Sequence, residues 1–282
     1  MKLASYLFAG KEEFGVVVGD GIIAMNRRLG GGFPSLRDAL AGNALDEMRR
    51  AAKDATPDRK LAEIRFLPAI PNPAKILCAG INYRAHASET GRELPKKPSM
   101  FARFADTLIG HEGEMVRPSV STNFDFEGEL AIIIGRGGRH IPEKEALDHV
   151  AGYTCFCDGS VRDFQKDSVT SGKNFPATGP LGPWIVTADE IPDPTRLTLV
   201  TRLNGKEMQR TGTDLMIHSI PTIIAYCSDF TPLAPGDVIA TGTPEGVGHG
   251  RNPPLWMKPG DMLEIEITGI GILRSRIVDE QR

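Results

Sequence analysis

The chain has 282 residues, of which 40% are hydrophobic and 24% are charged, and its formal net charge at pH 7 is −3. This composition is ordinary for a globular protein, and the length suits one large domain or a main domain with a small companion. Because no block of Lys and Arg stands out, the sequence argues against nucleic acid as the main partner.

The sequence also argues against a membrane protein. No apolar run approaches the roughly 20 residues that a membrane-spanning helix needs. The start, Met1 to Tyr6, lacks the long apolar core of a secretion signal. We therefore expect an enzyme of the cytoplasm.

The first seventy residues differ in pattern from the rest of the chain. Strand patterns cover residues 3–9 and 14–25, with glycine turns between them. A capping box at Ser35 predicts a short helix, and a second helical pattern covers 44–53. The chain then becomes rich in proline, which favours a domain boundary near residues 68–73.

We therefore predict a small N-terminal α/β domain over residues 1–70 and a main domain over residues 71–282. Helical patterns in the main domain are few: 142–149, 160–167 and 219–229. Strand-like runs dominate it: 75–79, 114–117, 124–134, 150–157, 183–187, 197–204, 237–241 and 262–268. This order does not fit a parallel doubly wound sheet. It predicts an α+β protein, mainly β, with an antiparallel or mixed sheet folded over on itself.

Two carboxylates precede the most apolar of these runs. Glu127 and Glu129 alternate along a predicted strand, so they share a face with Cα atoms roughly 7 Å apart. The run 131–134 that follows is apolar on both faces, which is typical of an interior strand. Like charges beside a buried strand repel each other and lose hydration, and a divalent cation relieves both costs. The alternative is an acidic stripe that faces solvent.

A third carboxylate, Asp158, ends the apolar run 150–157; its alternative role is that of a turn residue. Three oxygen donors without sulfur or imidazole indicate a hard cation, Mg²⁺ first and Mn²⁺ second. Arg162 and Gln165 share a face of the helix expected after Asp158. They can bind the polar tail of a substrate, or simply face solvent.

A candidate base lies upstream. His86 and Glu89 are three residues apart, so on a helical turn they face each other, and the carboxylate would raise the basicity of the imidazole. Such a pair can take a proton from water or from carbon. The polar segment 91–98 that follows could be a mobile lid. The alternative is an exposed helix with an incidental His.

Two further candidates lie in glycine-rich segments. Lys173 follows Gly172, but the glycine spacing is not that of a phosphate-binding loop. The lysine can bind a substrate carboxylate or a developing enolate. The alternative is a lysine on the surface. The Thr243 hydroxyl and nearby backbone N–H groups can hold a carboxylate. The remaining histidines and the cysteines show no ligand spacing and are read as structural or surface residues: His111, His140, His149, His218, His249, Cys78, Cys155, Cys157 and Cys227.

Taken in order over about residues 75–275, these motifs resemble the fumarylacetoacetate hydrolase family. The matching segments are 80–89, 125–130, 152–158, 162–165, 172–173, 182–184 and 241–248. The first seventy residues match only loosely. One departure is Cys157, which stands where many relatives have Asn before the metal-binding Asp.

The resemblance implies a folded-over mixed β-sandwich with a metal site at its mouth, usually in a homodimer. It implies that Mg²⁺ or Mn²⁺ is bound by Glu127, Glu129 and Asp158. His86 with Glu89 would be the general base acting through water. Lys173 would steady an oxyanion or enolate, and Thr243 would help to bind the substrate acid group.

It also implies a small 2-oxo acid substrate. The leading expectation is hydrolytic C–C cleavage of an acylpyruvate (a 2,4-diketo acid), such as fumarylpyruvate or a 2,4-diketo-3-deoxy sugar acid, to pyruvate and a carboxylic acid. The alternatives are decarboxylation of oxaloacetate or a homologue, and isomerisation of an unsaturated 2-oxo diacid. A non-catalytic metal-dependent binding protein is a different class, against which the His86–Glu89 pair speaks.

Overall fold

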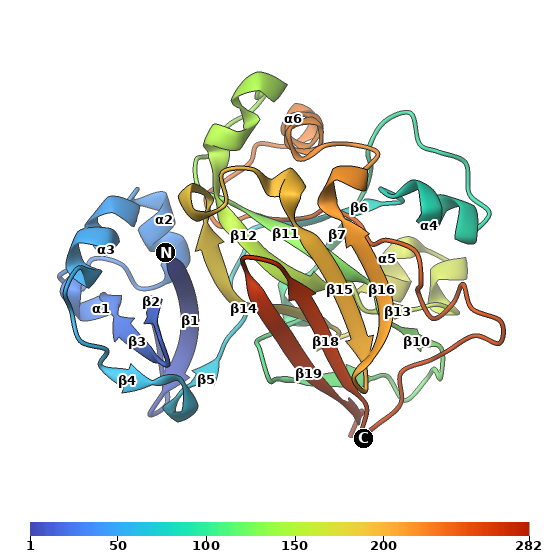
Figure 1. Ribbon diagram of the computed structural model, residues 1–282, viewed down its shortest axis with the longest axis horizontal. Coiled ribbons are helices and arrows are strands. Elements are labelled where there is room, and N and C mark those ends of the chain that lie inside the picture. The colour runs from blue at the N-terminus through green and yellow to red at the C-terminus, as the bar shows by residue number, and fades with distance from the viewer. Residues whose placement is uncertain (282) are drawn as a thin grey trace.

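The computed structural model describes residues 1–281, and most of its strands belong to two sheets (Figure 1). Across the larger sheet the order is β4 (Arg59–Lys60), β3 (Gly21–Ala24), β2 (Lys11–Val18), β1 (Lys2–Phe8), β14 (Gly179–Thr187), β12 (Val150–Cys157), β11 (Gly128–Ile134), β17 (Val238–Ala240), β6 (Ile76–Gly80) and β7 (Ser99–Arg103). Off this path, β5 (Arg65–Phe66) pairs with β1, and β8 (Leu108–Ile109) pairs with β14.

The second sheet packs across one face of the first. Its order is β16 (Lys206–Gly212), β15 (Thr198–Leu203), β18 (Met262–Ile267), β19 (Gly271–Asp279) and β9 (Glu114–Arg117). A short ribbon pairs β10 (Phe124–Asp125) with β13 (Ser160–Val161). Most pairs are antiparallel, but β6–β17, β8–β14 and β9–β19 are parallel. The predicted mixed, mainly β fold is therefore confirmed.

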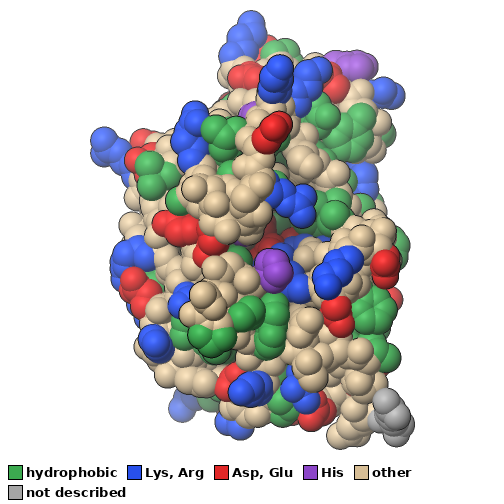
Figure 2. Space-filling model, turned by 90° about the vertical axis from the view of Figure 1, so that its right-hand side faces the viewer, with side chains coloured by type: hydrophobic (Ala, Val, Ile, Leu, Met, Phe, Trp, Pro, Cys, Tyr) green, Lys and Arg blue, Asp and Glu red, His purple; other side chains and the backbone are tan. Residues whose placement is uncertain are grey.

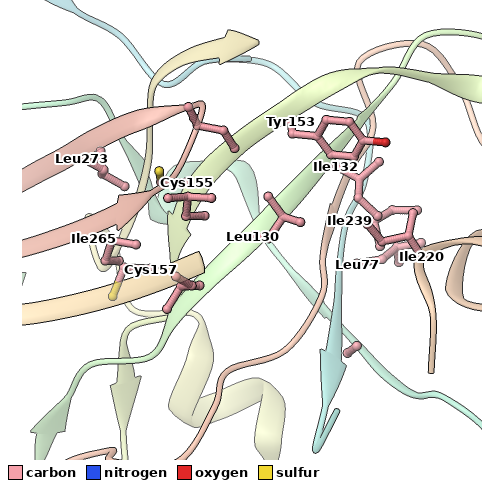
Figure 3. Packing of buried hydrophobic residues seen from close by; sticks show 14 of the residues in the cluster. Leu77, Leu130, Ile132, Tyr153, Cys155, Cys157, Ile220, Ile239, Ile265 and Leu273 are labelled. Atoms are coloured by element: carbon pink, nitrogen blue, oxygen red, sulfur yellow. The ribbon is translucent and has the colours of Figure 1, made fainter. Parts of the chain in front are cut away.

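The core follows from the alternation of side chains along β11, which is buried on both faces. Leu130, Ile132 and Ile134 pack toward the second sheet with Ile265 and Leu273, among others. Figure 3 shows several of these side chains meeting between the two sheets. The intervening Ala131 and Ile133 belong to a second cluster on the opposite face. The stretch 131–134 of this strand is therefore apolar on both faces, as the sequence indicated, whereas Glu129 lies near the start of the strand.

Helices are short and lie outside the sheets (Figure 1). The α-helices are α1 (Met25–Arg28), α2 (Leu36–Ala41), α3 (Leu45–Ala52), α4 (Arg84–Glu89), α5 (Val169–Lys173) and α6 (Ile220–Phe230). The 3₁₀ turns are η1 (Leu61–Glu63), η2 (Ala105–Thr107), η3 (Glu143–His149), η4 (Phe164–Lys166), η5 (Ala188–Glu190), η6 (Pro194–Arg196) and η7 (Thr213–Leu215). The capping box at Ser35 is present, since the Ser35 side chain accepts the Asp38 N–H.

Two local predictions are wrong. The helix expected over 160–167 is instead β13, a turn and η4, because Ser160 and Val161 pair with Asp125 and Phe124. The strand expected over 124–134 is interrupted between β10 and β11, so Glu127 lies outside a strand. Among residues 1–281, no helix combines the length and apolar character needed to span a membrane.

The first seventy residues continue the larger sheet. Lys2 pairs with Val186 and Leu3 pairs with Ile185 where β1 joins β14. Leu3 and Ile185 belong to the same buried cluster, which therefore runs across residue 70. The predicted division into two domains stays a prediction, and the two parts share one sheet and one core.

Candidate functional site

A pocket of about 290 Å³ opens on the side of the molecule that carries α4 and α5. Figure 2 views this side and shows acidic side chains at the bottom of a hollow, with basic and histidine side chains around it. Its volume is close to the lower limit of typical ligand pockets, about 300 Å³. Of the predicted site residues, these line it: His86, Glu127, Glu129, Asp158, Arg162, Gln165, Lys173 and Thr243.

Three carboxylates converge at the bottom of the pocket. Each of Glu127, Glu129 and Asp158 offers an oxygen, and these oxygens lie within 4.8 Å of one another. The side chains come together because Gly128 of β11 pairs with Cys157 of β12, and because the Asp158 N–H donates to the Glu127 carbonyl at 2.9 Å. All three are buried, so their charges must be compensated locally.

Cationic side chains compensate two of these acids. Lys173 Nζ lies 2.6 Å from Glu127 Oε2 and 2.6 Å from Asp158 Oδ2. Arg162 Nη2 lies 2.6 Å from Glu127 Oε1. Burial alone would raise the pKa of Glu127, but the charges of Lys173 and Arg162 lower it to about 2. Glu127 is therefore ionised.

Glu129 is different, because it faces acids without a cation bound to its own carboxylate. Its Oε2 accepts the Gly242 N–H at 2.8 Å. Burial, followed by the charges of Asp158 and Glu127, raises the pKa of Glu129 well above its usual value. A positive charge at this point would remove that cost.

The donor set fits a hard divalent cation. Carboxylate oxygens are the ligands that Mg²⁺ and Mn²⁺ prefer, and the three oxygens are close enough to share one ion. The excess of buried negative charge around Glu129 provides the driving force. Glu127, Glu129 and Asp158 are therefore the residues that can hold such an ion.

The candidate base lies on α4. His86 Nδ1 is 3.4 Å from Glu89 Oε2, and His86 is 6% exposed at the pocket wall. The Glu89 carboxylate also accepts the Gly246 N–H, at 3.0 Å and 3.1 Å. This backbone contact fixes Glu89, which in turn orients the imidazole. The structure places the two side chains face to face, and their catalytic role stays a prediction.

The other candidates are held by neighbouring groups. Arg162 donates to Asp125 Oδ2 through Nε at 2.8 Å and to Gln165 Oε1 through Nη1 at 3.0 Å. Lys173 ends α5 and is buried, so it does not lie on the surface. The Thr243 hydroxyl donates to the Gly128 carbonyl at 3.0 Å and accepts Gln209 Nε2 at 2.8 Å.

Three buried polar residues of the site were not identified from the sequence. Asp125 accepts the N–H groups of Gly248 and His249 as well as Arg162. Arg103 Nη1 lies 2.5 Å from Asp158 Oδ1, and Gln209 Oε1 accepts the Gly128 N–H at 3.0 Å. Asp125 stands beside the two Glu residues in the sequence and could have been suspected. Arg103 and Gln209 carry no such signal, because their partners are distant along the chain.

The family of the chain follows from comparison with known proteins. Residues 75–278 match the fumarylacetoacetate (FAA) hydrolase C-terminal family. The chain is 39% identical over 238 residues to the human mitochondrial oxaloacetate tautomerase FAHD2A, a match that covers 83% of this chain and 76% of that protein.

The solved structures that are similar over 100% of both chains include two enzymes of named activity. The maleylpyruvate hydrolase of Sphingobium sp. SYK-6, in complex with manganese (II) ion and pyruvate, has 29% identity and a TM-score of 0.84. The 5-carboxymethyl-2-hydroxymuconate delta-isomerase of Mycobacterium smegmatis has 31% identity and a TM-score of 0.78.

Proposed function

The chain belongs to the fumarylacetoacetate hydrolase family, and we propose that it catalyses proton transfer at the carbon next to the keto group of a 2-oxo acid. The proposed reaction is a keto–enol tautomerisation or a related isomerisation. It depends on a divalent cation, Mg²⁺ or Mn²⁺, bound by Glu127, Glu129 and Asp158. This places proton transfer ahead of the hydrolysis that the sequence favoured.

One observation carries the proposal: the buried His86, which is paired with Glu89, lines the same pocket as the three acids. A single imidazole that Glu89 orients is sufficient to take a proton from carbon and to return it to carbon or oxygen. Hydrolysis would need the same base and also an attacking water. Proton transfer is therefore the reaction that needs fewest groups beyond those present.

The chain's own residues supply binding and charge. The bound cation would stabilise negative charge on the carboxylate and keto oxygens of the substrate. Burial alone would lower the pKa of Lys173, but the charges of Asp158 and Glu127 raise it. Lys173 therefore stays protonated and adds positive charge beside the reacting oxygen. The Glu89 carboxylate, 3.4 Å from His86 Nδ1, holds the imidazole that takes the proton in place.

The names of the relatives support this chemistry. The human relative is an oxaloacetate tautomerase, and the Mycobacterium smegmatis structure is a delta-isomerase. Both names describe movement of a proton and a double bond without cleavage of the carbon skeleton. We transfer that reaction class to this chain.

Hydrolysis of an acylpyruvate is the second candidate. The maleylpyruvate hydrolase structure covers this chain entirely, including the first seventy residues, whereas the tautomerase match covers 83% of it. In this reaction His86 would activate a water that attacks the far carbonyl, and the enolate of pyruvate would leave. The third possibility, decarboxylation of oxaloacetate, needs no base and leaves the His86–Glu89 pair without a role.

The experiment separates these reactions. Purified enzyme with Mg²⁺ or Mn²⁺ is given oxaloacetate in D₂O, and deuterium entry at C3 is followed by NMR, with acylpyruvates assayed in parallel for products. We expect exchange well above the uncatalysed rate, and we expect His86→Gln to lower it by about 10²- to 10⁴-fold. Cleavage products with acylpyruvates and no accelerated exchange would establish the hydrolase instead, whereas full activity of His86→Gln would remove the proposed base.

We also propose that the protein is a homodimer of the cytoplasm, with a small 2-oxo acid rather than nucleic acid or membrane as its partner. Sedimentation velocity of the purified chain measures the oligomeric state. Fractionation of the source cells, with detection of the protein in each fraction, measures its location.

A further inference from the structure

One backbone loop contacts both the acidic cluster and the candidate base. The glycine-rich loop, residues 241–251, follows β17 on the side of the molecule that carries α4 (Figure 1). Its Gly242 N–H donates to Glu129 Oε2 at 2.8 Å, and its Gly246 N–H donates to both carboxylate oxygens of Glu89, at 3.0 Å and 3.1 Å. The position of Glu89, and through it that of His86, therefore depends on where this loop lies.

The loop has no regular structure of its own to hold it, because residues 241–251 form neither helix nor strand. Gly246 lies against β16 with φ +93°, and a Cβ at this position would lie 2.2 Å from the Met208 carbonyl oxygen. Only a glycine fits so close to the neighbouring strand. Contacts made by side chains must therefore keep the loop in this place.

Arg251 ties the loop to β16. Its Nη2 donates to the Gly246 carbonyl and to the Met208 carbonyl, both at 2.8 Å, and its Nε donates to the Gly246 carbonyl at 3.3 Å. Met208 falls in a β-bulge of this edge strand, opposite the register shift between Thr201 and Arg202, and a bulged residue is left out of the regular ladder. The guanidinium thus joins two backbone segments that the sheet itself does not join.

The same loop reaches Glu89 a second time. A Cβ at Gly250 would lie 2.5 Å from Glu89 Cδ, so the Glu89 side chain packs directly against the residue that precedes Arg251. Glu89 is therefore enclosed by Gly246 and Gly250. Arg251 fixes Gly246 through its carbonyl group and Gly250 through the chain itself.

We propose that Arg251 is a positioning residue for the base. It holds Gly246 and Gly250 against Glu89. Glu89 then keeps the proton of His86 on Nδ1, and Nε2 stays free to take a proton from the substrate. Arg251 does not line the pocket, so it acts only through these contacts. This inference rests on the proposed role of His86 and adds the residue that maintains its geometry.

The first measurement needs no substrate. In protein labelled with ¹⁵N-histidine, NMR shows which imidazole nitrogen carries the proton, and His86→Gln assigns the signal. In alkaline buffer we expect the wild-type imidazole to carry its proton on Nδ1. In Arg251→Ala we expect a mixture of the Nδ1–H and Nε2–H forms, because Glu89 no longer stays in place beside Nδ1.

The second measurement is deuterium exchange into oxaloacetate by the Mg²⁺-loaded enzyme. We expect Arg251→Ala to lower kcat about tenfold, since a small displacement of a catalytic group is costly. KM should change by less than about twofold, because Arg251 lies outside the pocket lining. Arg251→Lys should recover part of the loss, since an ammonium group donates to a carbonyl but lacks the planar fork of the guanidinium.

Two comparisons separate positioning from a general loss of stability. Arg139→Ala removes another arginine that donates to a backbone carbonyl, that of Asp229 at 3.2 Å, at an exposed position outside the pocket lining. It should keep the wild-type spectrum and kcat. In a Glu89→Gln background, Arg251→Ala should lower kcat little further, because the two changes break one chain of contacts.

The outcomes separate this inference from the proposed function. An unchanged His86 signal in Arg251→Ala would refute the inference even if kcat or the free energy of unfolding falls, because the residue would then be only structural. Additive losses of kcat in the Glu89→Gln background would refute it as well. If Arg251→Ala does not fold, Arg251→Gln and Arg251→Lys provide the same comparison. If the wild type shows no accelerated exchange, the proposed function fails, whereas the NMR comparison still decides whether Arg251 positions His86.

Discussion

At the scale of single residues, Glu129 differs from Glu127, whose pKa is lowered to about 2. The pKa of Glu129 is raised well above its usual value, first by burial and then by the charges of Asp158 and Glu127. A carboxylate has to lose its proton before it can bind a metal. Because protons compete with the metal, we expect Mn²⁺ affinity to fall as pH falls and metal binding to release protons. Calorimetry in buffers of different ionisation enthalpy measures both quantities.

Glu129→Gln tests this assignment directly. The amide keeps the shape of the side chain but removes the charge and the titration. We expect Mn²⁺ affinity to fall by about tenfold or more, and its dependence on pH to become shallower. An unchanged titration curve for the variant would exclude Glu129 from the ligands.

Arg103 is a second residue for which the contacts predict an effect on stability. Its side chain is 0% exposed and contacts Asp158 at 2.5 Å. Arg103→Met leaves the Asp158 charge buried with one partner fewer, and breaking such a pair costs about 3–5 kcal/mol. We expect the free energy of unfolding, measured in urea without metal, to fall by that order. Arg103→Lys should lose less, and equal stability of the methionine variant would show that Lys173 alone compensates Asp158.

These residues also show what the sequence could and could not predict. Glu127, Glu129 and Asp158 stand at the starts and ends of apolar runs, so pairing of neighbouring strands brings them together. Arg103 lies 55 residues from Asp158, and Gln209 lies 81 residues from Gly128. No local pattern connects such pairs, because only the topology of the sheets makes them neighbours.

At the scale of elements, the sequence predicted strands correctly where burial determines which residues form the strand. It failed where the geometry of the backbone determines where a strand begins or breaks. β11 and β12 are buried on both faces and were predicted within a few residues of their bounds. The break at Glu127 and the strand β13 were missed. Ser160 and Val161 pair with a distant segment, and that pairing outweighs a local capping pattern.

The pairing of β12 with β14 gives a prediction for one glycine. A Cβ on Gly152 would lie 2.2 Å from the Val186 carbonyl oxygen, which is backbone and cannot rotate away. Gly152→Ala must therefore shift the two strands apart, and we expect a loss of about 1–3 kcal/mol in urea unfolding. Gly32→Ala is the control, since its Cβ would meet only one atom, at 3.7 Å. Similar stability of the two variants would contradict the packing described here.

At the scale of the whole molecule, the sheet that carries the site also carries the first seventy residues. The pairs Lys2–Val186 and Leu3–Ile185 connect β1 to β14, and a single buried cluster extends over both parts. The proline-rich segment near residues 68–73 indicated a boundary because prolines interrupt regular strands and helices. Composition does not report that the strands on either side pair with each other.

This continuity predicts that the two parts unfold together. The two tryptophans report on different regions: Trp184 lies in β14 near the junction, within 4.8 Å of Lys2 Nζ, and Trp256 stacks on His249 at the pocket rim. In Trp256→Phe the remaining Trp184 reports on the junction, and in Trp184→Phe the remaining Trp256 reports on the pocket. We expect the fluorescence of each variant to show a single urea transition. That transition should coincide with the one measured by circular dichroism on the same variant.

Leu3→Ala completes the test from the N-terminal side. Leu3 is 0% exposed and packs at the junction, so its truncation should cost about 2–5 kcal/mol. If the molecule is one cooperative unit, this loss must shift the Trp256 transition as much as the Trp184 transition, although Leu3 lies in β1 and Trp256 lies at the pocket. A shift confined to Trp184 would instead mean that residues 1–70 unfold as an independent domain, as the sequence pattern alone suggested.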